Sequence, residues 1–298
     1  MRFGAHCVLY GAEVGSDPQK IIGTLAKTGA EGCELGQRFF GLERREELET
    51  VLRENQMELA GLHCNQFKLT DLLENPQAAK KALEAVAEFV APLKNKNVIA
   101  TGMVPMEEIR DLPIAAGAPM PQLHDKETVK QMAFVLNDIV KDIKNTYGVQ
   151  VHYHNHSWEF ADNGLIWFAL ADYAPDLKFA LDTGWAAVSG YQPLELIKTY
   201  PGRFDYIHLR DYKAAADPVK DTFNQVHKGF IDLGTGKMGY PEFIRELKNE
   251  LKDDAWAIVE YEIGNFDQNS YLGAINYLRG LQDMADLYRK GEQTGGEA

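Results

Sequence analysis

The sequence predicts an α/β fold in a single domain, a closed (β/α)₈ TIM barrel. The chain has 298 residues, and such a barrel typically takes ~250. Eight short apolar runs alternate with longer amphipathic segments, a pattern typical of parallel strands joined by crossover helices. No change in composition marks a second domain. We therefore expect one barrel over residues 1–290 and a polar, glycine-rich, flexible tail over 291–298.

Each strand is predicted from a short apolar run, and each helix from the segment with helical spacing that follows it. In the first half of the chain the clearest helices are the Ala-rich segment 76–93 and the long segment 126–147. The four strand–helix pairs of this half are 3–9 with 18–28, 32–35 with 44–55, 58–63 with 76–93, and 97–101 with 126–147.

The second half of the chain repeats the same alternation. Pro241 stands at the start of the predicted helix 241–251, a position that proline favours. The four pairs are 149–154 with 165–173, 178–182 with 193–199, 205–209 with 241–251, and 255–262 with 270–288. Eight pairs fit a closed barrel better than an open sheet, which usually has fewer strands.

Two connections are too long to be plain turns. One covers residues 103–125 and contains four prolines, and the other covers residues 212–239 and is rich in charge and glycine. Both follow strands, so both are expected on the barrel face where active sites form. Long loops in compact domains are usually functional.

Composition and charge exclude several classes of protein. Asp plus Glu number 44 and Lys plus Arg 31, so the net charge is −13, which argues against a general nucleic-acid binder. No apolar stretch approaches the ~18 residues of a membrane span, and the amino terminus lacks the pattern of a signal peptide. Cys7, Cys33 and Cys64 are a sparse, odd set, which favours reduced and buried thiols. We expect a cytoplasmic protein without nucleic-acid or membrane partners.

Four consecutive strands each end in a His, Asp or Glu: His154, Asp182, His208 and Glu260. His154 is the middle one of three histidines at alternate positions, which share one face of the fifth strand. Imidazole nitrogens and carboxylate oxygens suit a divalent ion such as Mn²⁺, Co²⁺ or Zn²⁺. Because adjacent strands lie ~5 Å apart, the four side chains could converge on one ion.

Each of these residues alone has an ordinary structural explanation. Asp182 before Thr-Gly is typical of a turn or helix cap, His208 of a core histidine, and Glu260 of a buried salt-bridge partner. Their common relation to four neighbouring strands favours a metal site. His6, Glu34 and His63 on the first three strands are weaker candidates, for which pocket lining and core or rim packing are both open.

Four motifs resemble the sugar phosphate isomerase/epimerase family, which belongs to the xylose isomerase-like TIM barrel superfamily. That superfamily also holds inosose dehydratases, ketose 3-epimerases and endonuclease IV. The resemblance covers roughly the whole chain and is dense between His152 and Glu262. The motifs are Tyr-His-Asn-His-x-x-Glu-Phe at 153–160, Leu-Asp-Thr-Gly-Trp at 181–185, Ile-His-Leu-Arg-Asp at 207–211, and Val-Glu at 259–260.

The resemblance implies a divalent metal held by Glu, Asp, His and Glu on strands five to eight. The last three carry over to Asp182, His208 and Glu260. On strand five the chain has His154 where many relatives have Glu, so either His154 replaces that ligand or Glu159 reaches back; we favour His154. The metal would be Mn²⁺, Co²⁺, Zn²⁺ or Mg²⁺, since these ligand types do not separate them.

The family's chemistry implies an enzyme that removes a proton next to the carbonyl of a sugar, polyol or keto-sugar. His156 or Glu260 would take the proton, and the imidazole of His154 stands where relatives have a catalytic carboxylate. Return of the proton gives isomerisation or epimerisation. Loss of a β-substituent gives elimination, as in a lyase or dehydratase acting on an inosose or a 3-keto-glycoside.

The substrate is expected to contact further residues near the strand ends, and its phosphorylation state is open. Arg210 would bind an anionic group or pair with Asp211, and Trp185 would stack on a sugar, form the pocket wall or belong to the core. The full set expected to bind substrate is His63, Glu159, Trp185, Arg210 and Glu262.

Two other functions and the oligomeric state stay open. An endonuclease IV-like repair enzyme would need more metal ligands and a basic groove, and a sugar-binding barrel without catalysis would have no need of the metal. Relatives are often dimers or tetramers, so a homo-oligomer is possible.

Overall fold

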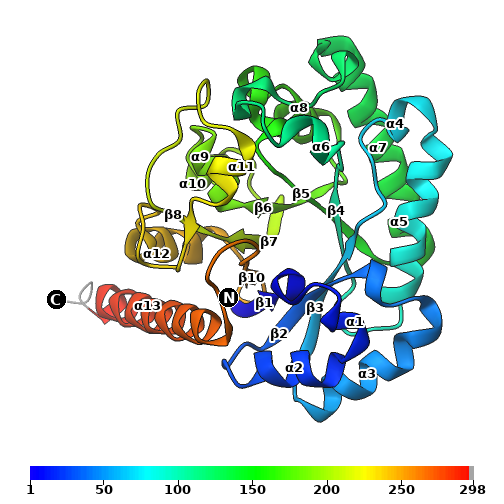
Figure 1. Cartoon of the computed structure of the whole chain (residues 1–298). Coiled ribbons are helices and arrows are strands. Elements are labelled where there is room, and N and C mark those ends of the chain that lie inside the picture. The colour runs from blue at the N-terminus through cyan, green and yellow to red at the C-terminus, as the bar shows by residue number, and fades with distance from the viewer. Residues whose placement is uncertain (295–298) are drawn as a thin grey trace.

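The computed structural model describes residues 1–294 and forms a closed barrel of eight parallel strands, with helices around its outside (Figure 1). The (β/α)₈ fold predicted from the sequence is therefore confirmed. Each strand pairs with its sequence neighbours, and the last pairs with the first to close the wall. In order around the barrel the strands are β1 (Arg2–His6), β2 (Gly32–Gly36), β3 (Glu58–Cys64), β4 (Asn97–Thr101), β5 (Gln150–His154), β6 (Lys178–Asp182), β7 (Phe204–Leu209) and β10 (Trp256–Val259).

The principal helices follow the strands as predicted, with ends that differ by a few residues. Polar caps fix several of them: the Asp125 carboxylate accepts the Thr128 N–H at the start of α7, and Gly148 ends α7 in the left-handed conformation. The helices are α2 (Pro18–Ala26), α3 (Arg45–Glu54), α5 (Pro76–Val90), α7 (Lys126–Tyr147), α8 (Ala161–Tyr173), α10 (Pro193–Thr199), α12 (Tyr240–Glu250) and α13 (Gln268–Thr294).

Short helical turns complete the connections outside the two long loops. The predicted strand 3–9 is shorter than expected, because the His6 side chain accepts the Val8 N–H and starts a 3₁₀ turn at Cys7. These turns are η1 (Cys7–Tyr10), α1 (Glu13–Ser16), η2 (Gln37–Phe39), η3 (Leu42–Arg44), α4 (Asp71–Glu74), η6 (Trp158–Phe160) and α9 (Thr183–Val188).

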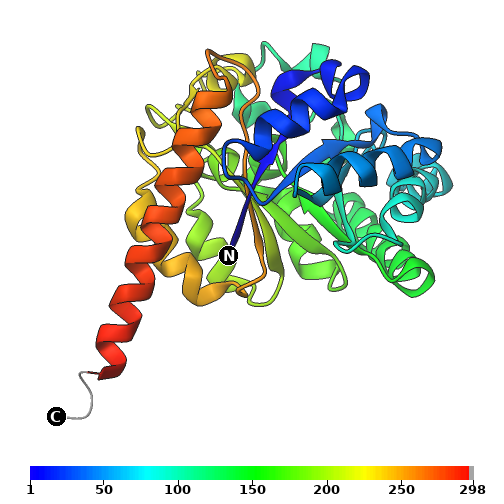
Figure 2. The same ribbon diagram turned by 90° about the horizontal axis from the view of Figure 1, so that it is seen from below.

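The carboxyl end of the chain is a long helix. Figure 2 shows α13 extending past the end of the barrel. It runs to Thr294, so it includes the first part of the segment 291–298 that the sequence assigns to a flexible tail. Residues 295–298 lie outside the described part of the chain.

The two long connections lie against each other. The first contains α6 (Met106–Ile109), η4 (Ile114–Ala116) and η5 (Pro121–His124), and the second contains α11 (Phe223–His227) and a two-stranded sheet of β8 (Asp211–Tyr212) and β9 (Phe230–Ile231). Backbone hydrogen bonds join them: Ile114 N–H donates to the Asp221 carbonyl and Phe223 N–H to the Leu112 carbonyl. The position of α11 therefore depends on both loops.

The barrel interior is apolar at one level and polar at the carboxyl ends of the strands. A compact apolar cluster fills the interior, formed by Ala60, Ile99, Ala180, Tyr206, Trp256 and Ile258. A larger core lies between the strands and the helices. The three cysteines are buried and free. Within residues 1–294 we find no helix with the length and apolarity needed to cross a membrane.

Candidate functional site

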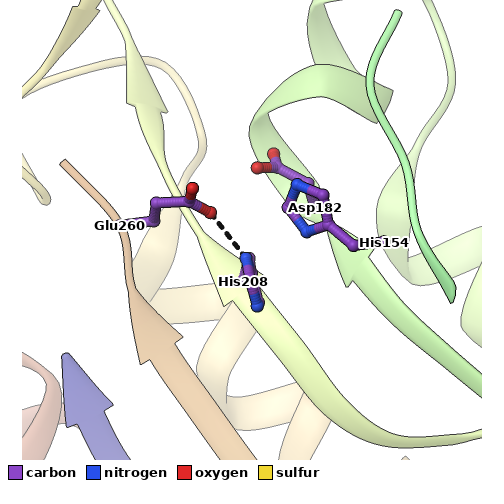
Figure 3. A group of neighbouring side chains, drawn as sticks. All are labelled: His154, Asp182, His208 and Glu260. Carbon is purple, nitrogen blue, oxygen red and sulfur yellow. Dashed lines mark hydrogen bonds and ion pairs between the residues drawn. The ribbon is translucent and has the colours of Figure 1, made fainter. Parts of the chain in front are cut away.

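Four side chains from neighbouring strands converge at the carboxyl end of the barrel (Figure 3). His154 ends β5, Asp182 ends β6, His208 lies near the end of β7 and Glu260 directly follows β10. One nitrogen or oxygen atom from each lies within 4.8 Å of the others, and all four residues are buried. The strand register aligns Asp182 with His208, which explains why residues far apart in sequence meet here. These are the four residues that the sequence predicts as metal ligands.

The donor set of this group fits a divalent cation. It offers two imidazole nitrogens and two carboxylates, ligand types suited to Zn²⁺, Mn²⁺ or Co²⁺. Nδ1 of His154 is buried and has no hydrogen-bond partner, an arrangement that a ligand would relieve. Burial, together with the nearby His208 and His156, lowers the pKa of His154 well below its usual value. His154 is therefore a neutral imidazole, the form that binds metals.

His208 is held between two carboxylates. Its Nδ1 lies 2.5 Å from Glu260 Oε2, and its Nε2 lies 2.8 Å from Glu34 Oε2. Burial works to lower the pKa of His208, but the charges of Glu34 and Glu260 outweigh burial and raise it to about 10. A cation bound at Nδ1 would take the place of a proton there.

Arg210 is a buried cation behind this group. Its guanidinium lies 2.7 Å from Asp182 Oδ2 and 2.8 Å from an oxygen of both Glu260 and Glu262. Three carboxylates therefore compensate the charge of Arg210. The alternative ion pair with Asp211 is wrong, because the Asp211 carboxylate instead accepts backbone N–H groups of the loop at 234–238.

A cavity of about 170 Å³ opens beside the four converging residues. Five residues expected to act in catalysis or substrate binding line it: His63, His154, His156, Glu260 and Glu262. Among the described residues, Arg38 is the one Arg or Lys side chain in its wall. The rest of the wall includes five histidines, two carboxylates and three aromatic rings, together with smaller polar and apolar side chains.

His156 forms part of the cavity wall as a neutral imidazole. Its ring stacks on Trp158, with centroids 4.2 Å apart and planes 8° from parallel. Nδ1 of His156 is buried without a hydrogen-bond partner. Burial lowers the pKa of His156 to about 3. The ring is therefore unprotonated near neutral pH.

Three residues expected to bind substrate do not line the cavity. Glu159 is fully buried and accepts hydrogen bonds from the Tyr153 hydroxyl and the His156 N–H, both at 2.8 Å, so it shapes the end of β5. Trp185 is also fully buried, and it stacks on Phe223 at 4.7 Å. The third, Arg210, is occupied by the carboxylates described above. All three support the site from behind its wall.

Several polar residues of the cavity were not predicted from the sequence, and His227 is one that contacts an expected site residue. His227 on α11 lines the cavity, and its Nε2 lies 2.7 Å from Glu262 Oε2. The helical spacing of Phe223 and His227 was the available signal, since residues four apart share one helix face. Only the packing of the long loop shows that this face turns toward the barrel.

The comparisons with known proteins agree with one another. A family model described as xylose isomerase-like TIM barrel matches residues 22–281. Inosose dehydratase 1 of Bacillus cereus is 24% identical over 288 residues, which covers 92% of this chain and 91% of that protein. An inosose dehydratase of Bacillus anthracis is 23% identical over 284 residues, covering 90% of each chain.

Solved structures show the same fold at low sequence identity. D-psicose 3-epimerase from Clostridium cellulolyticum H10 aligns with a TM-score of 0.68 and 13% identity, covering 95% of this chain and 99% of that one. 3-Keto-D-glucoside 4-epimerase from E. coli aligns with a TM-score of 0.67 and 13% identity, covering 94% and 99%. A sugar phosphate isomerase/epimerase from Parabacteroides distasonis aligns with a TM-score of 0.66 and 18% identity, covering 93% of this chain and 92% of that one.

Proposed function

Because the chain belongs to the xylose isomerase-like TIM barrel family, we propose that it is a metal-dependent enzyme acting on a small sugar, polyol or keto-sugar. Its reaction begins with removal of a proton next to a carbonyl. The observation that carries this proposal is the convergence of His154, Asp182, His208 and Glu260 beside a small cavity. These four residues would hold the ion, which would polarise the carbonyl and stabilise the negative charge that develops on its oxygen.

His156 is the residue that we assign as the general base. Its Nδ1 has no other partner, and the ring lines the cavity in its neutral form. Glu260 is less suited, because one of its oxygens lies against His208 and the other against Arg210. The proton would pass from the α-carbon to the imidazole of His156, while the electron pair of the C–H bond moves toward the carbonyl oxygen. Such general-base catalysis typically contributes ~10²–10⁴-fold.

Isomerisation or epimerisation follows when the proton returns to carbon. Elimination is the second candidate, and the pair of His227 and Glu262 favours it. A second imidazole on the cavity wall can give a proton to a departing hydroxyl, which leaves as water. The inosose dehydratases among the relatives, whose names denote the loss of water, also support elimination.

The volume and the lining of the cavity favour a small, uncharged substrate. Its volume of about 170 Å³ is below the ~300–1,000 Å³ of pockets for drug-sized ligands. Trp158 and Phe223 form aromatic parts of its wall, and each is held by stacking on another ring, His156 and Trp185 respectively. Arg210 is occupied by carboxylates, and Arg38 is the one Arg or Lys side chain of the described wall, beside the carboxylates of Glu260 and Glu262. A phosphate group would therefore meet two negative groups for one positive group. We therefore expect unphosphorylated substrates to be preferred.

The test is solvent exchange in D₂O. Metal-free protein is loaded with Mn²⁺ or Co²⁺ and incubated with ketohexoses, inososes and 3-keto-glucosides, and proton NMR follows deuterium incorporation next to the carbonyl and product formation. We expect the wild-type protein to exchange a proton of at least one substrate class with solvent. Asp182→Asn should lose both this exchange and metal binding. The Asn side chain keeps the acceptor for the Trp185 N–H, so the fold should persist.

The results also separate the rival functions. Protein that binds no metal and exchanges no substrate proton would overturn the proposal and favour a sugar-binding barrel. Several zinc ions per chain, with cleavage of abasic DNA, would favour an endonuclease IV-like enzyme. The net charge of −13 and the few cationic groups in the cavity argue against that function.

A further inference from the structure

A single buried carboxylate lies behind the candidate metal ligands and contacts four other side chains. Glu34, on β2, is fully buried. Its Oε2 accepts the Tyr206 hydroxyl at 2.7 Å and lies 2.8 Å from His208 Nε2. Its Oε1 lies 2.9 Å from His63 Nδ1 and 3.1 Å from His6 Nε2. The partners come from β1, β3 and β7, so one carboxylate links three other strands of the barrel.

This carboxylate sets the orientation of His208. Both ring nitrogens of His208 face carboxylates, so a cation bound at Nδ1 would replace the proton on that atom, while the proton on Nε2 stays and is donated to Glu34 Oε2. Nδ1 faces Glu260, within the group formed with His154 and Asp182. A carboxylate that accepts from the far nitrogen of a metal-binding histidine fixes both its tautomer and its ring orientation.

A second cation held by Glu34 itself is the competing interpretation, since His6, Glu34 and His63 also offer ligand atoms within 4.8 Å of one another. The hydrogen bonds of His6 argue against it. Nδ1 of His6 accepts the Val8 N–H at 3.1 Å, so the proton of the neutral ring is on Nε2, the atom that faces Glu34. A protonated Nε2 has no lone pair to offer a metal, whatever its contact with the carboxylate 3.1 Å away.

We propose that Glu34 is a positioning residue for the metal ligand His208. It does not touch the ion; it holds the far nitrogen of His208 so that Nδ1 presents its lone pair to the ligand group. Loss of such an outer partner typically costs ~10–100-fold in metal affinity. The inference rests on the proposed function to the extent that it requires a metal at this group.

The first measurement is the Co²⁺ affinity of metal-free protein by titration calorimetry. We expect Glu34→Gln to bind Co²⁺ ~10–100-fold more weakly than wild type, with an unchanged circular dichroism spectrum. Glu58→Gln is the matched control, because Glu58 is also a strand carboxylate with several partners but pairs with Arg2 and Lys94 at the start of β3. It should keep the wild-type Co²⁺ affinity.

The second measurement reports on the His208 ring directly. In protein labelled with ¹⁵N-histidine and loaded with diamagnetic Zn²⁺, we expect a hydrogen-bonded Nε2–H signal for His208 that is lost or shifted in Glu34→Gln. Glu34→Asp serves if Glu34→Gln does not fold, since it keeps the charge but shortens the reach to His208. It should show the same NMR change and a several-fold loss of affinity.

The outcomes separate this inference from the proposed function. Wild-type protein that binds no Co²⁺ would overturn both. Wild-type protein that binds Co²⁺, with unchanged affinity and an unchanged His208 signal in the folded Glu34 variant, would overturn the positioning role alone. Equal losses in Glu34→Gln and Glu58→Gln would also overturn it, because they would show a general effect of removing a strand carboxylate.

Discussion

At the scale of single residues, the fifth strand shows how similar side chains separate into different tasks. His154 points into the ligand group, because alternate residues of a strand share one face. His156 lies two residues further on and reaches the cavity wall, where it stacks on Trp158. Glu159 turns back and accepts hydrogen bonds from the same segment. Between the two ligands that the sequence left open, the geometry favours His154 over Glu159.

His156→Gln should separate proton removal from metal binding. The amide keeps a polar side chain in the wall but cannot accept the proton, so we expect solvent deuterium exchange to fall ~10²–10⁴-fold while Co²⁺ affinity stays within a few-fold of wild type. His152→Gln on the same strand is the control, because His152 pairs with Asp205 and does not line the cavity. Exchange that persists at the wild-type rate in His156→Gln would exclude His156 as the base.

Glu159 should make the stability of the protein depend on pH. Burial raises its pKa to about 7, although the His156 N–H and the Tyr153 hydroxyl favour the charged form. Between pH ~4.5 and ~7 the unfolded chain releases this proton and the folded protein keeps it, so stability falls as pH rises. The raised pKa of Glu159 lowers the free energy of unfolding by about 3 kcal/mol above pH ~7 and leaves it unchanged below pH ~4.5.

Glu159→Gln imitates the protonated acid and should remove this dependence. Urea unfolding at pH 5 and pH 8 measures it: the variant should gain about 3 kcal/mol relative to wild type between the two values. Glu46→Gln on the exposed face of α3 controls for the loss of one charge. Parallel pH profiles for wild type and Glu159→Gln would show that the carboxyl of Glu159 titrates normally.

At the scale of elements, α11 connects the long loops to the chemistry of the site. The helix begins at a capping box of Thr222 and Gln225, and hydrogen bonds from the N–H groups of Phe223 and Asn224 join it to the first long connection, 103–125. This support places Phe223 and His227 on the cavity wall. A five-residue helix is too short to be stable alone, so its position comes from these contacts.

His227→Gln should test the role of α11 in elimination. The amide can still donate to Glu262, but it cannot supply a proton to a leaving hydroxyl. We expect exchange at the α-carbon to persist and dehydration of a keto-sugar to slow ~10²–10⁴-fold, both followed by NMR. Lys228→Gln, exposed at the end of the same helix, should behave as wild type. If exchange and dehydration fall together in His227→Gln, the residue does not act in the second step alone.

At the scale of the whole molecule, closure of the barrel depends on close packing where β2, β3 and β10 approach inside it. Trp256 on β10 belongs to the interior cluster and reaches across to Gly32 of β2. A Cβ at Gly32 would lie 2.7 Å from the Trp256 ring and 2.7 Å from the Glu58 carbonyl oxygen. Only glycine leaves room for the ring at this level of the barrel.

Gly32→Ala should therefore destabilise the whole domain by about 1–3 kcal/mol, measured by urea unfolding. Gly273→Ala is the matched control in an exposed part of α13, where a Cβ meets no atom within 4 Å. It should stabilise the protein by about 0.5–1 kcal/mol, because alanine is favoured in helices. If both substitutions change stability equally, the steric argument for Gly32 is wrong.

The sequence by itself determined the barrel, the strand–helix pairs and the four residues that converge at its mouth. Each of these is encoded by local patterns, namely apolar runs, helical spacing and polar residues such as Asp182 and His208 at the ends of strands. In a barrel that pattern is enough, because the carboxyl ends of all strands meet on one face.

The tertiary structure alone decided which of the remaining polar residues face the cavity. Arg210 and Glu262 lie two residues apart from candidate ligands, yet one is enclosed by carboxylates and the other lines the wall. His227 contacts Glu262, 35 positions away in the chain, and Glu34 contacts His208, 174 positions away. Such contacts depend on loop packing and barrel register, which no local pattern contains.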